Sequence, residues 1–114
     1  MGGDSSASGT GSRQGTIDML ILQTLTVEPA HGYAIAQHIS LLSEEVLRLD
    51  QGSLYPALER LQRMGWVTSA WRKTPTGRRA RYYTITSSGR KQLGARVSDY
   101  HRVSTAINRI LRGV

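Results

Sequence analysis

Apolar residues recur at helical spacing in the first half of the chain, and the pattern changes near residue 66. A first helix is expected from Thr16, which can cap it, to a stop at Pro29. Asp18 then falls in the first turn, where a negative charge suits the helix dipole. The apolar face of this helix is formed by Ile17, Leu20, Ile21 and Leu25.

Two further helices are expected before the pattern changes. One begins near residue 31, and residues 46–49 after it read as a short strand-like step. The next begins within residues 50–53 and ends at Gly65, a natural C-terminal stop. Its core face is formed by Leu54, Leu58 and Leu61.

The second half of the chain predicts a β-hairpin followed by a long helix. Residues 66–72 and 81–86 are β-like runs, and residues 73–79 between them contain both Pro and Gly, as a basic hairpin tip would. A helix capped by Ser87 or Ser88 then runs to about Leu111, a length of ~36 Å at 1.5 Å per residue. Its apolar stripe predicts binding to a second copy of the chain. The stripe consists of Leu93, Val97, Tyr100, Ile107 and Leu111.

This order of elements predicts a mainly α fold with a small β-wing, in the α+β class. Three helices followed by a two-stranded wing form the layout of a winged helix-turn-helix, which we assign to residues 13–86. Residues 87–114 form the expected C-terminal dimerisation helix. Residues 1–12 are almost all Gly, Ser, Ala and Thr, and we expect a disordered tail or a cloning remnant there.

Composition excludes several classes of function. The chain has 114 residues and no cysteine, which excludes disulfides, thiol catalysis and thiolate metal sites. No apolar run reaches the ~18 residues that span a bilayer, and no signal peptide opens the chain, so we expect a cytoplasmic protein with no membrane partner. The three histidines lack companions at metal-ligand spacing, and no base–nucleophile pair can be proposed. No metal, cofactor or catalytic residue is predicted, and we do not expect an enzyme.

The distribution of charge indicates a polyanionic partner. The net charge is +7, and no acidic residue occurs between Glu59 and Asp99. A basic block of this kind repels itself unless a polyanion neutralises it, and nucleic acid is the favoured partner over an anionic membrane surface or a merely solvated face. The block contains Arg60, Arg63, Arg72, Lys73, Arg78, Arg79, Arg81, Arg90, Lys91 and Arg96.

Four stretches of the chain resemble those of PadR-type transcriptional regulators. The likeness spans roughly residue 15 to the end, and the order and spacing of the stretches make it specific. The stretches are GTIDMLIL at 15–22, HGYAI at 31–35, GSLYPALERL at 52–61 followed by MGWV at 64–67, and RARYYTIT at 79–86 with Gly89.

The resemblance implies a homodimer that binds double-stranded DNA and represses transcription, usually until a small-molecule effector relieves the repression. With one C-terminal helix, the chain is similar to the short-form branch. Some short-form members bind flat aromatic drugs between tryptophans of the dimerisation helix. In this chain both tryptophans, Trp66 and Trp71, lie in the first wing strand, so the resemblance does not extend to that drug site.

The third helix supplies the residues expected to face the bases. The N-terminal residues of a recognition helix usually contact base edges, and here they are Gln51, Gly52 and Ser53. Gln51 can pair with adenine, Ser53 can bond several bases, and Gly52 allows a close backbone approach. Ser53 can equally serve, with Asp50, as a helix cap.

The phosphates are expected to meet residues of the second helix, the third helix and the wing. Tyr33 and Tyr55 can reach a phosphate through their hydroxyls, although Tyr55 also fits a half-buried core position. Arg60 either contacts phosphate or is solvated. The wing cations can contact phosphates, or an arginine can enter the minor groove. These cations are Lys73, Arg78, Arg79 and Arg81.

A winged-helix module that binds proteins rather than DNA is the remaining alternative, because a fold does not dictate a function. The basic wing argues against it, since a module without DNA has little reason to keep Arg78, Arg79 and Arg81 free of acidic neighbours.

Overall fold

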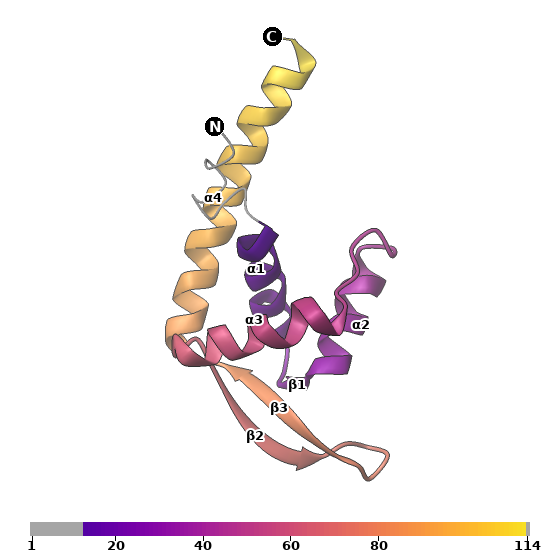
Figure 1. The fold of residues 1–114 in the computed structure, drawn as a ribbon. Coiled ribbons are helices and arrows are strands. Elements are labelled where there is room, and N and C mark those ends of the chain that lie inside the picture. The colour runs from indigo at the N-terminus through magenta and orange to yellow at the C-terminus, as the bar shows by residue number, and fades with distance from the viewer. Residues whose placement is uncertain (1–12, 114) are drawn as a thin grey trace.

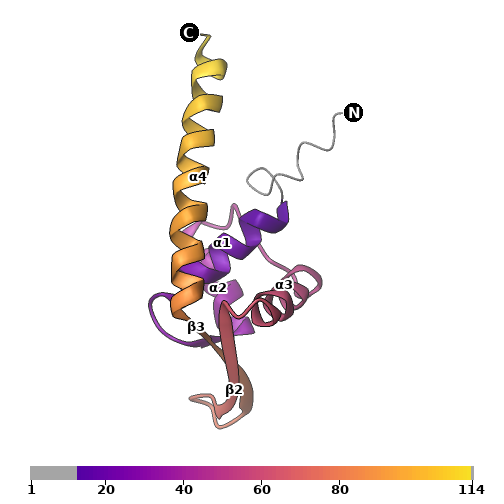
Figure 2. The same ribbon diagram turned by 90° about the vertical axis from the view of Figure 1, so that its left-hand side faces the viewer.

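A computed structural model describes residues 13–113, and the predicted tail at residues 1–12 lies outside this range. The described part of the chain forms a small helical body, a β-hairpin wing and one long helix that leaves the body (Figure 1). The elements in chain order are α1 (Arg13–Leu25), β1 (Ala30–His31), α2 (Gly32–Leu42), α3 (Gln51–Arg63), β2 (Val67–Lys73), β3 (Arg79–Ile85) and α4 (Ser87–Arg112). This is the predicted α+β winged-helix class, with the wing and α4 extending in opposite directions (Figure 2).

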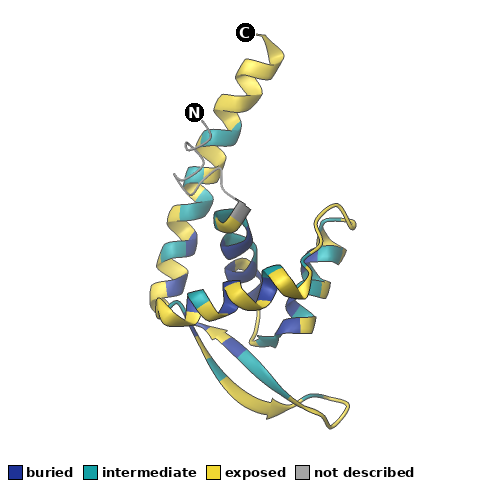
Figure 3. Ribbon diagram, in the orientation of Figure 1, coloured by how far each residue is buried: buried dark blue, intermediate teal, exposed yellow. Residues whose placement is uncertain are grey.

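The core lies where α1 meets the other three helices and the start of the wing. Ile21 and Leu22 of α1 are fully buried, as are Leu58 and Leu61 of α3. Val67 of β2 is also buried there. The buried positions therefore follow the apolar spacing of the first and third helices, whose faces were predicted (Figure 3).

The three strands form one antiparallel sheet with the order β1-β3-β2. The hairpin register pairs Val67 with Ile85 at its base and Lys73 with Arg79 at its tip. The two-residue strand β1 adds to the outer edge of β3, where Ala30 pairs with Tyr83.

The short strand predicted at residues 46–49 is wrong. The segment between α2 and α3 is a turn in which Glu44 and Glu45 have positive φ angles of 53° and 67°. The Ser43 hydroxyl accepts a hydrogen bond from the backbone N–H of Leu47 at 3.0 Å, and this side-chain bond favours a turn over an extended strand. The third strand of the sheet is β1, which precedes α2.

Side chains cap three helices, but not all of them are those predicted. The Asp50 carboxylate caps α3 by accepting the backbone N–H of Ser53 at 2.9 Å. His31 caps α2 through Nδ1, which accepts the N–H of Ala34. The predicted cap Thr16 lies inside α1, and Thr86 rather than Ser87 or Ser88 caps α4.

The long helix α4 packs on the body along its first half. Gly89 passes so close to the wing base that an added Cβ would lie 2.2 Å from the carbonyl oxygen of Trp66. Leu93, 7% exposed, belongs to the core, whereas every residue from Thr105 to Gly113 is exposed (Figure 3). The 26 residues of α4 span about 39 Å, so the outer half projects beyond the body. Among the described residues, no helix combines the length and the hydropathy that crossing a bilayer requires.

Candidate nucleic-acid interface

The first part of the candidate interface is the start of α2. Because His31 caps this helix, Tyr33 lies in its first turn with its ring directed to the surface, where the residue is 68% exposed. The His31 ring also packs edge-on against Tyr82 of β3, at 5.2 Å between ring centroids. The start of α2 is therefore fixed against the wing strand while Tyr33 stays free to contact a ligand.

Tyr55 of α3 lies against the start of α2. A Cβ added at Gly32 would lie 2.7 Å from the Tyr55 hydroxyl and 2.9 Å from its ring, so the tyrosine ring lies directly on this glycine and would have to shift for any larger residue. Tyr55 nevertheless remains 43% exposed. The ring thus packs against Gly32 of α2 without belonging to the hydrophobic core.

Three arginines of the wing lie over aromatic rings. The guanidinium groups of Arg79 and Arg81 lie 5.4 and 5.1 Å from the centre of the Trp71 ring. Arg72 lies 4.3 Å from the centre of the Tyr82 ring. Such contacts restrict the arginines without neutralising them, so their positive charge remains available to an anion.

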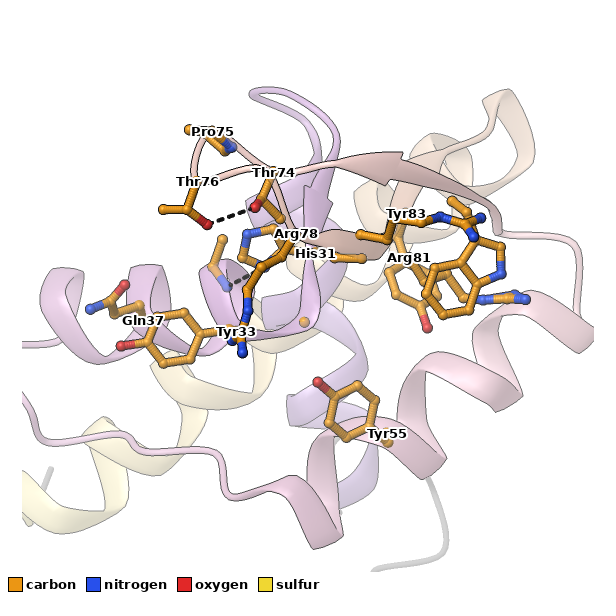
Figure 4. Close-up of a pocket in the computed structure, with 15 residues that line it drawn as sticks. His31, Tyr33, Gln37, Tyr55, Thr74, Pro75, Thr76, Arg78, Arg81 and Tyr83 are labelled. Carbon is orange, nitrogen blue, oxygen red and sulfur yellow. Dashed lines mark hydrogen bonds between the residues drawn. The ribbon is translucent and has the colours of Figure 1, made fainter.

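The tip of the wing is a closed turn. The backbone N–H of Thr74 donates to the carbonyl of Arg78 at 2.6 Å, and Gly77 adopts the left-handed φ of 91° that the turn requires. The hydroxyls of Thr74 and Thr76 lie 3.0 Å apart (Figure 4). Arg78 follows this turn and points back toward Tyr33 (Figure 4).

A hydrogen-bond chain joins the wing to α3. The Ser69 hydroxyl on β2 donates to the side-chain oxygen of Gln62 on α3 at 3.0 Å. The Arg81 guanidinium donates to the same hydroxyl at 3.2 Å. This chain fixes the spacing between α3 and the wing, which a ligand touching both elements would have to match.

Two adjoining hollows lie between these elements. One, of about 730 Å³, is enclosed by the start of α2, by Tyr55 and by the wing, including Arg78, Arg79 and Arg81 (Figure 4). The other, of about 800 Å³, lies between the outer face of α3 and β3. Tyr55, Arg81 and Tyr83 line both. Burial raises the pKa of the Tyr83 phenol, although the nearby charge of Arg81 opposes this shift, so the phenol stays neutral.

The structure brings half of the predicted DNA-binding residues together in the first hollow: Tyr33, Tyr55, Arg78, Arg79 and Arg81. Gln51 and Gly52 lie exposed in the first turn of α3, outside both hollows, and Ser53 is half-buried beside them. Lys73 is exposed at the end of β2. Residue-by-residue reasoning missed Gln37 and Trp71 in the first hollow and Gln62 in the second. Helical spacing from Tyr55 could have found Gln62, which lies seven residues further along the same face.

Arg60 has a different position from that predicted. Its guanidinium forms an ion pair with Asp18 of α1, a residue only 2% exposed. Asp18 was expected in the first turn of α1, but the helix begins at Arg13 and places the carboxylate against α3. Burial raises the pKa of the Asp18 carboxyl, and the hydrogen bond and charge of Arg60 act in the opposite direction. Arg60 thus joins two helices of the body, and we leave it out of the interface.

The predicted self-association stripe divides into an inner and an outer part. Leu93 lies in the core of its own chain and Val97 packs partly against that core. Tyr100 and Ile107 are about half exposed, and Leu111 is 77% exposed. Ile110, which the stripe did not include, is 75% exposed beside Leu111. The apolar surface left for a partner therefore lies on the outer half of α4.

The chemistry of the interface is mainly that of cations and hydrogen-bond donors. Within residues 13–113, no three His, Cys, Asp or Glu side chains gather closely enough to hold a metal ion. The two hollows present cations, phenols and amides, together with the carboxylate of Glu59, beside the outer face of α3. These groups donate hydrogen bonds to phosphate oxygens and to base edges.

Comparison with known proteins gives one consistent result. Residues 21–95 match the model of the transcriptional regulator PadR-like family. A transcriptional regulator from Clostridium thermocellum is 27% identical, with a TM-score of 0.76 over 83% of this chain and 89% of that one. A PadR-like transcriptional regulator from Bacillus cereus is 27% identical, with a TM-score of 0.75 over 88% and 95%. A PadR family regulator from Clostridium difficile is also 27% identical, with a TM-score of 0.72 over 83% and 97%.

Proposed function

The chain belongs to the PadR-like family of transcriptional regulators, and we propose that it regulates by binding double-stranded DNA through α3 and the wing. The family is defined by transcriptional regulation, not by an enzymatic reaction. The observation that carries the proposal is the first hollow, the one of about 730 Å³. Tyr33, Tyr55 and three wing arginines surround it beside α3. Groups from three separate elements converge there, and all of them can donate to phosphate.

Each part of the interface has a distinct role in this proposal. The recognition helix α3 enters the major groove, with Gln51, Gly52 and Ser53 at its leading end. Tyr33 and Tyr55 bond phosphates on one side of the helix. Lys73, Arg78, Arg79 and Arg81 follow the backbone, or place one arginine in the adjacent minor groove.

We further propose that two copies associate through the outer half of α4. The exposed Ile107 and Leu111 lie on one face with Tyr100 and Val97, at spacings of three, seven and four residues along the helix. Exposed apolar residues in a row on a projecting helix favour burial against an identical helix. A two-fold dimer would bind a palindromic site whose half-sites are about one turn of DNA, roughly 34–36 Å, or a multiple of it, apart.

Membership of the family supports two finer statements. We propose that the protein acts in the cytoplasm as a repressor, and that a small-molecule effector releases it from DNA. The recognition helix and α4 both pack on α1, so an effector that moved one of them would shift the other. Release would then follow from a change in the relative position of the two α3 helices of the dimer.

Salt-dependent binding to duplex DNA tests the proposal. Fluorescence anisotropy with a mixed-sequence duplex across a salt series measures how many phosphates the protein neutralises. The affinity of the native protein should fall steeply with salt, and the Arg78→Ala/Arg79→Ala variant should flatten the log–log slope by about one to two.

A matched control removes the same charge elsewhere. Arg109 and Arg112 are exposed in the last turn of α4, so Arg109→Ala/Arg112→Ala should keep the native slope. Absence of binding at low salt, or equal slopes for the wing variant and the native protein, would refute DNA binding by the wing. The module that binds proteins would then be the better interpretation.

A further inference from the structure

The outermost stripe of the recognition helix is formed by residues 52, 56, 59 and 63, at spacings of four, three and four. The opposite face holds the buried Leu54, Ala57, Leu58 and Leu61. All four outer positions are exposed, so this stripe is the part of α3 that would enter a groove most deeply.

The side chains of this stripe leave few groups that can read a base. Gly52 has no side chain and Pro56 has no polar side-chain atom. The remaining two positions are Glu59 and Arg63, which lie one helical turn apart and both line the second hollow. Any direct hydrogen bond from the centre of this stripe to a base edge must therefore come from Glu59 or Arg63.

Glu59 differs from every other residue around the two hollows because it alone among their lining residues is acidic. None of the ion pairs formed within residues 13–113 includes it. An unpaired carboxylate near DNA is repelled by the phosphates, and the repulsion lowers affinity for every sequence. Such a charge is offset only where the DNA supplies a donor.

We propose that Glu59 is a specificity-determining residue that accepts a hydrogen bond from the N4 amino group of a cytosine in the major groove. Cytosine is the base whose major-groove edge presents a donor without an adjacent ring-nitrogen acceptor, and carboxylates pair with it for that reason. At any other base pair the same carboxylate loses this bond and keeps its repulsion. This inference rests on the proposed DNA binding by α3.

Selection from a random-sequence duplex library, with sequencing of the bound fraction, tests the assignment. The native protein should select cytosine at one position of each half-site, by roughly 5- to 20-fold over the other bases. Glu59→Gln should move the preference at that position toward adenine, because a glutamine amide pairs with the adenine edge. Glu59→Ala should abolish the preference there and raise binding to unselected DNA.

Glu44→Gln serves as the matched control. Glu44 is exposed in the turn between α2 and α3 and lines neither hollow, and the variant removes the same charge. It should select the native site. Glutamine and alanine are good helix formers, so the exposed position 59 should tolerate both, which a melting curve checks.

The outcomes separate the two proposals. Unchanged preferences in both Glu59 variants would overturn the role of Glu59 while DNA binding stands. A uniform weakening of preference at all positions would also overturn it, because Glu59 would then merely orient Arg63 or Arg81. If the native protein selected no sequence at all, the proposed function would fail and this inference with it.

Discussion

The wing and the outer half of α4 both leave the helical body, but they expose opposite kinds of side chain. The wing presents arginines held against Trp71 and Tyr82. The outer half of α4 presents Ile107, Ile110 and Leu111, whose apolar surface no other part of residues 13–113 covers. Two projections of one small domain are therefore suited to two partners, a polyanion for the wing and an apolar surface for the helix.

The two projections nevertheless begin at the same corner of the molecule (Figure 2). The backbone N–H of Thr86 donates to the carbonyl of Trp66 at 3.0 Å, and the Thr86 hydroxyl donates to the carbonyl of Gly65 at 2.8 Å. The wing base and the cap of α4 thus share their hydrogen bonds. The wing and α4 therefore differ in the chemistry of their surfaces but are coupled in position. Substitutions in each of them, and in the corner that joins them, test this interpretation.

The largest effect is expected on the apolar projection. Ile107→Asp/Leu111→Asp replaces two exposed apolar side chains with charges, and burying each native side chain contributes about 1.5–3 kcal/mol. We expect the dissociation constant of the dimer to rise at least about 100-fold, as measured by sedimentation equilibrium. The isolated domain should stay folded, because neither residue belongs to its core.

The control places the same charges on another face of α4. Thr105 and Ala106 are exposed and lie outside the apolar stripe, so Thr105→Asp/Ala106→Asp should dimerise like the native protein. If both double variants were equally monomeric, the effect would come from helix charge and not from the stripe. A native protein that was monomeric at micromolar concentration would contradict self-association altogether.

The next effect concerns the body that carries both projections. Arg60→Met leaves the carboxylate of Asp18 buried without its partner, and breaking such a pair costs about 3 kcal/mol of unfolding free energy. Urea titration at pH 7 measures the loss. DNA binding by the folded fraction should keep the native salt slope. A slope reduced by about one, with little loss of stability, would instead support the original assignment of Arg60 to a phosphate.

The same variant has a defined pH dependence. An unfolded Asp18 titrates near 3.8, burial raises its pKa in the folded protein, and removing Arg60 raises it further. At a pH between the pKa of Asp18 in the unfolded protein and its higher pKa in the folded protein, the folded state binds more protons than the unfolded state. Stability therefore falls as the pH rises through this range. The loss caused by Arg60→Met should therefore be larger at pH 7 than at pH 5. An equal loss at both values would mean that Asp18 is not the affected group.

Local patterns in the sequence predicted the elements that local interactions determine. The helical spacing of apolar residues placed α1 to α4, and Pro75 with Gly77 marked the wing tip. The pattern failed at residues 46–49 because Val46 and Leu47 are exposed without a partner strand in the described part of the chain, while Leu49 packs partly against the core. It missed β1 because a two-residue strand is defined only by its pairing with β3, some fifty residues later.

The site shows the same limit. That the wing cations lie close together was predictable, because all of them belong to residues 73–81 of one hairpin. The position of Arg60 was not, since its partner Asp18 lies 42 residues earlier and reads, in sequence, as a residue that complements the helix dipole. The link from Gln62 through Ser69 to Arg81 likewise depends on how α3 packs against the wing, which no spacing along the chain encodes.

A smaller effect should test the corner where the projections meet. Gly89→Ala places a Cβ 2.2 Å from the carbonyl oxygen of Trp66, and we expect a loss of about 1–3 kcal/mol in unfolding free energy. Gly94→Ala, in the same helix, meets nothing within 4 Å and should gain up to about 1 kcal/mol from helix propensity. Urea titration of the pair separates crowding from propensity, and a stabilised Gly89→Ala would contradict the close packing of α4 on the wing base.

The smallest effect concerns the ring beneath the wing arginines. Trp71→Ala keeps every cation but removes the surface on which Arg79 and Arg81 lie, and an exposed contact of this kind contributes about 0.5–1 kcal/mol. DNA binding in the anisotropy assay should weaken by roughly two- to fivefold, with the salt slope unchanged because the number of neutralised phosphates is the same. A slope reduced by about two would mean that the arginines lose their phosphates without the ring. Unchanged affinity would mean that the wing acts through its charge alone. The wing and the outer half of α4 would then differ in charge, and the restraint of Arg79 and Arg81 by Trp71 would not contribute to that difference.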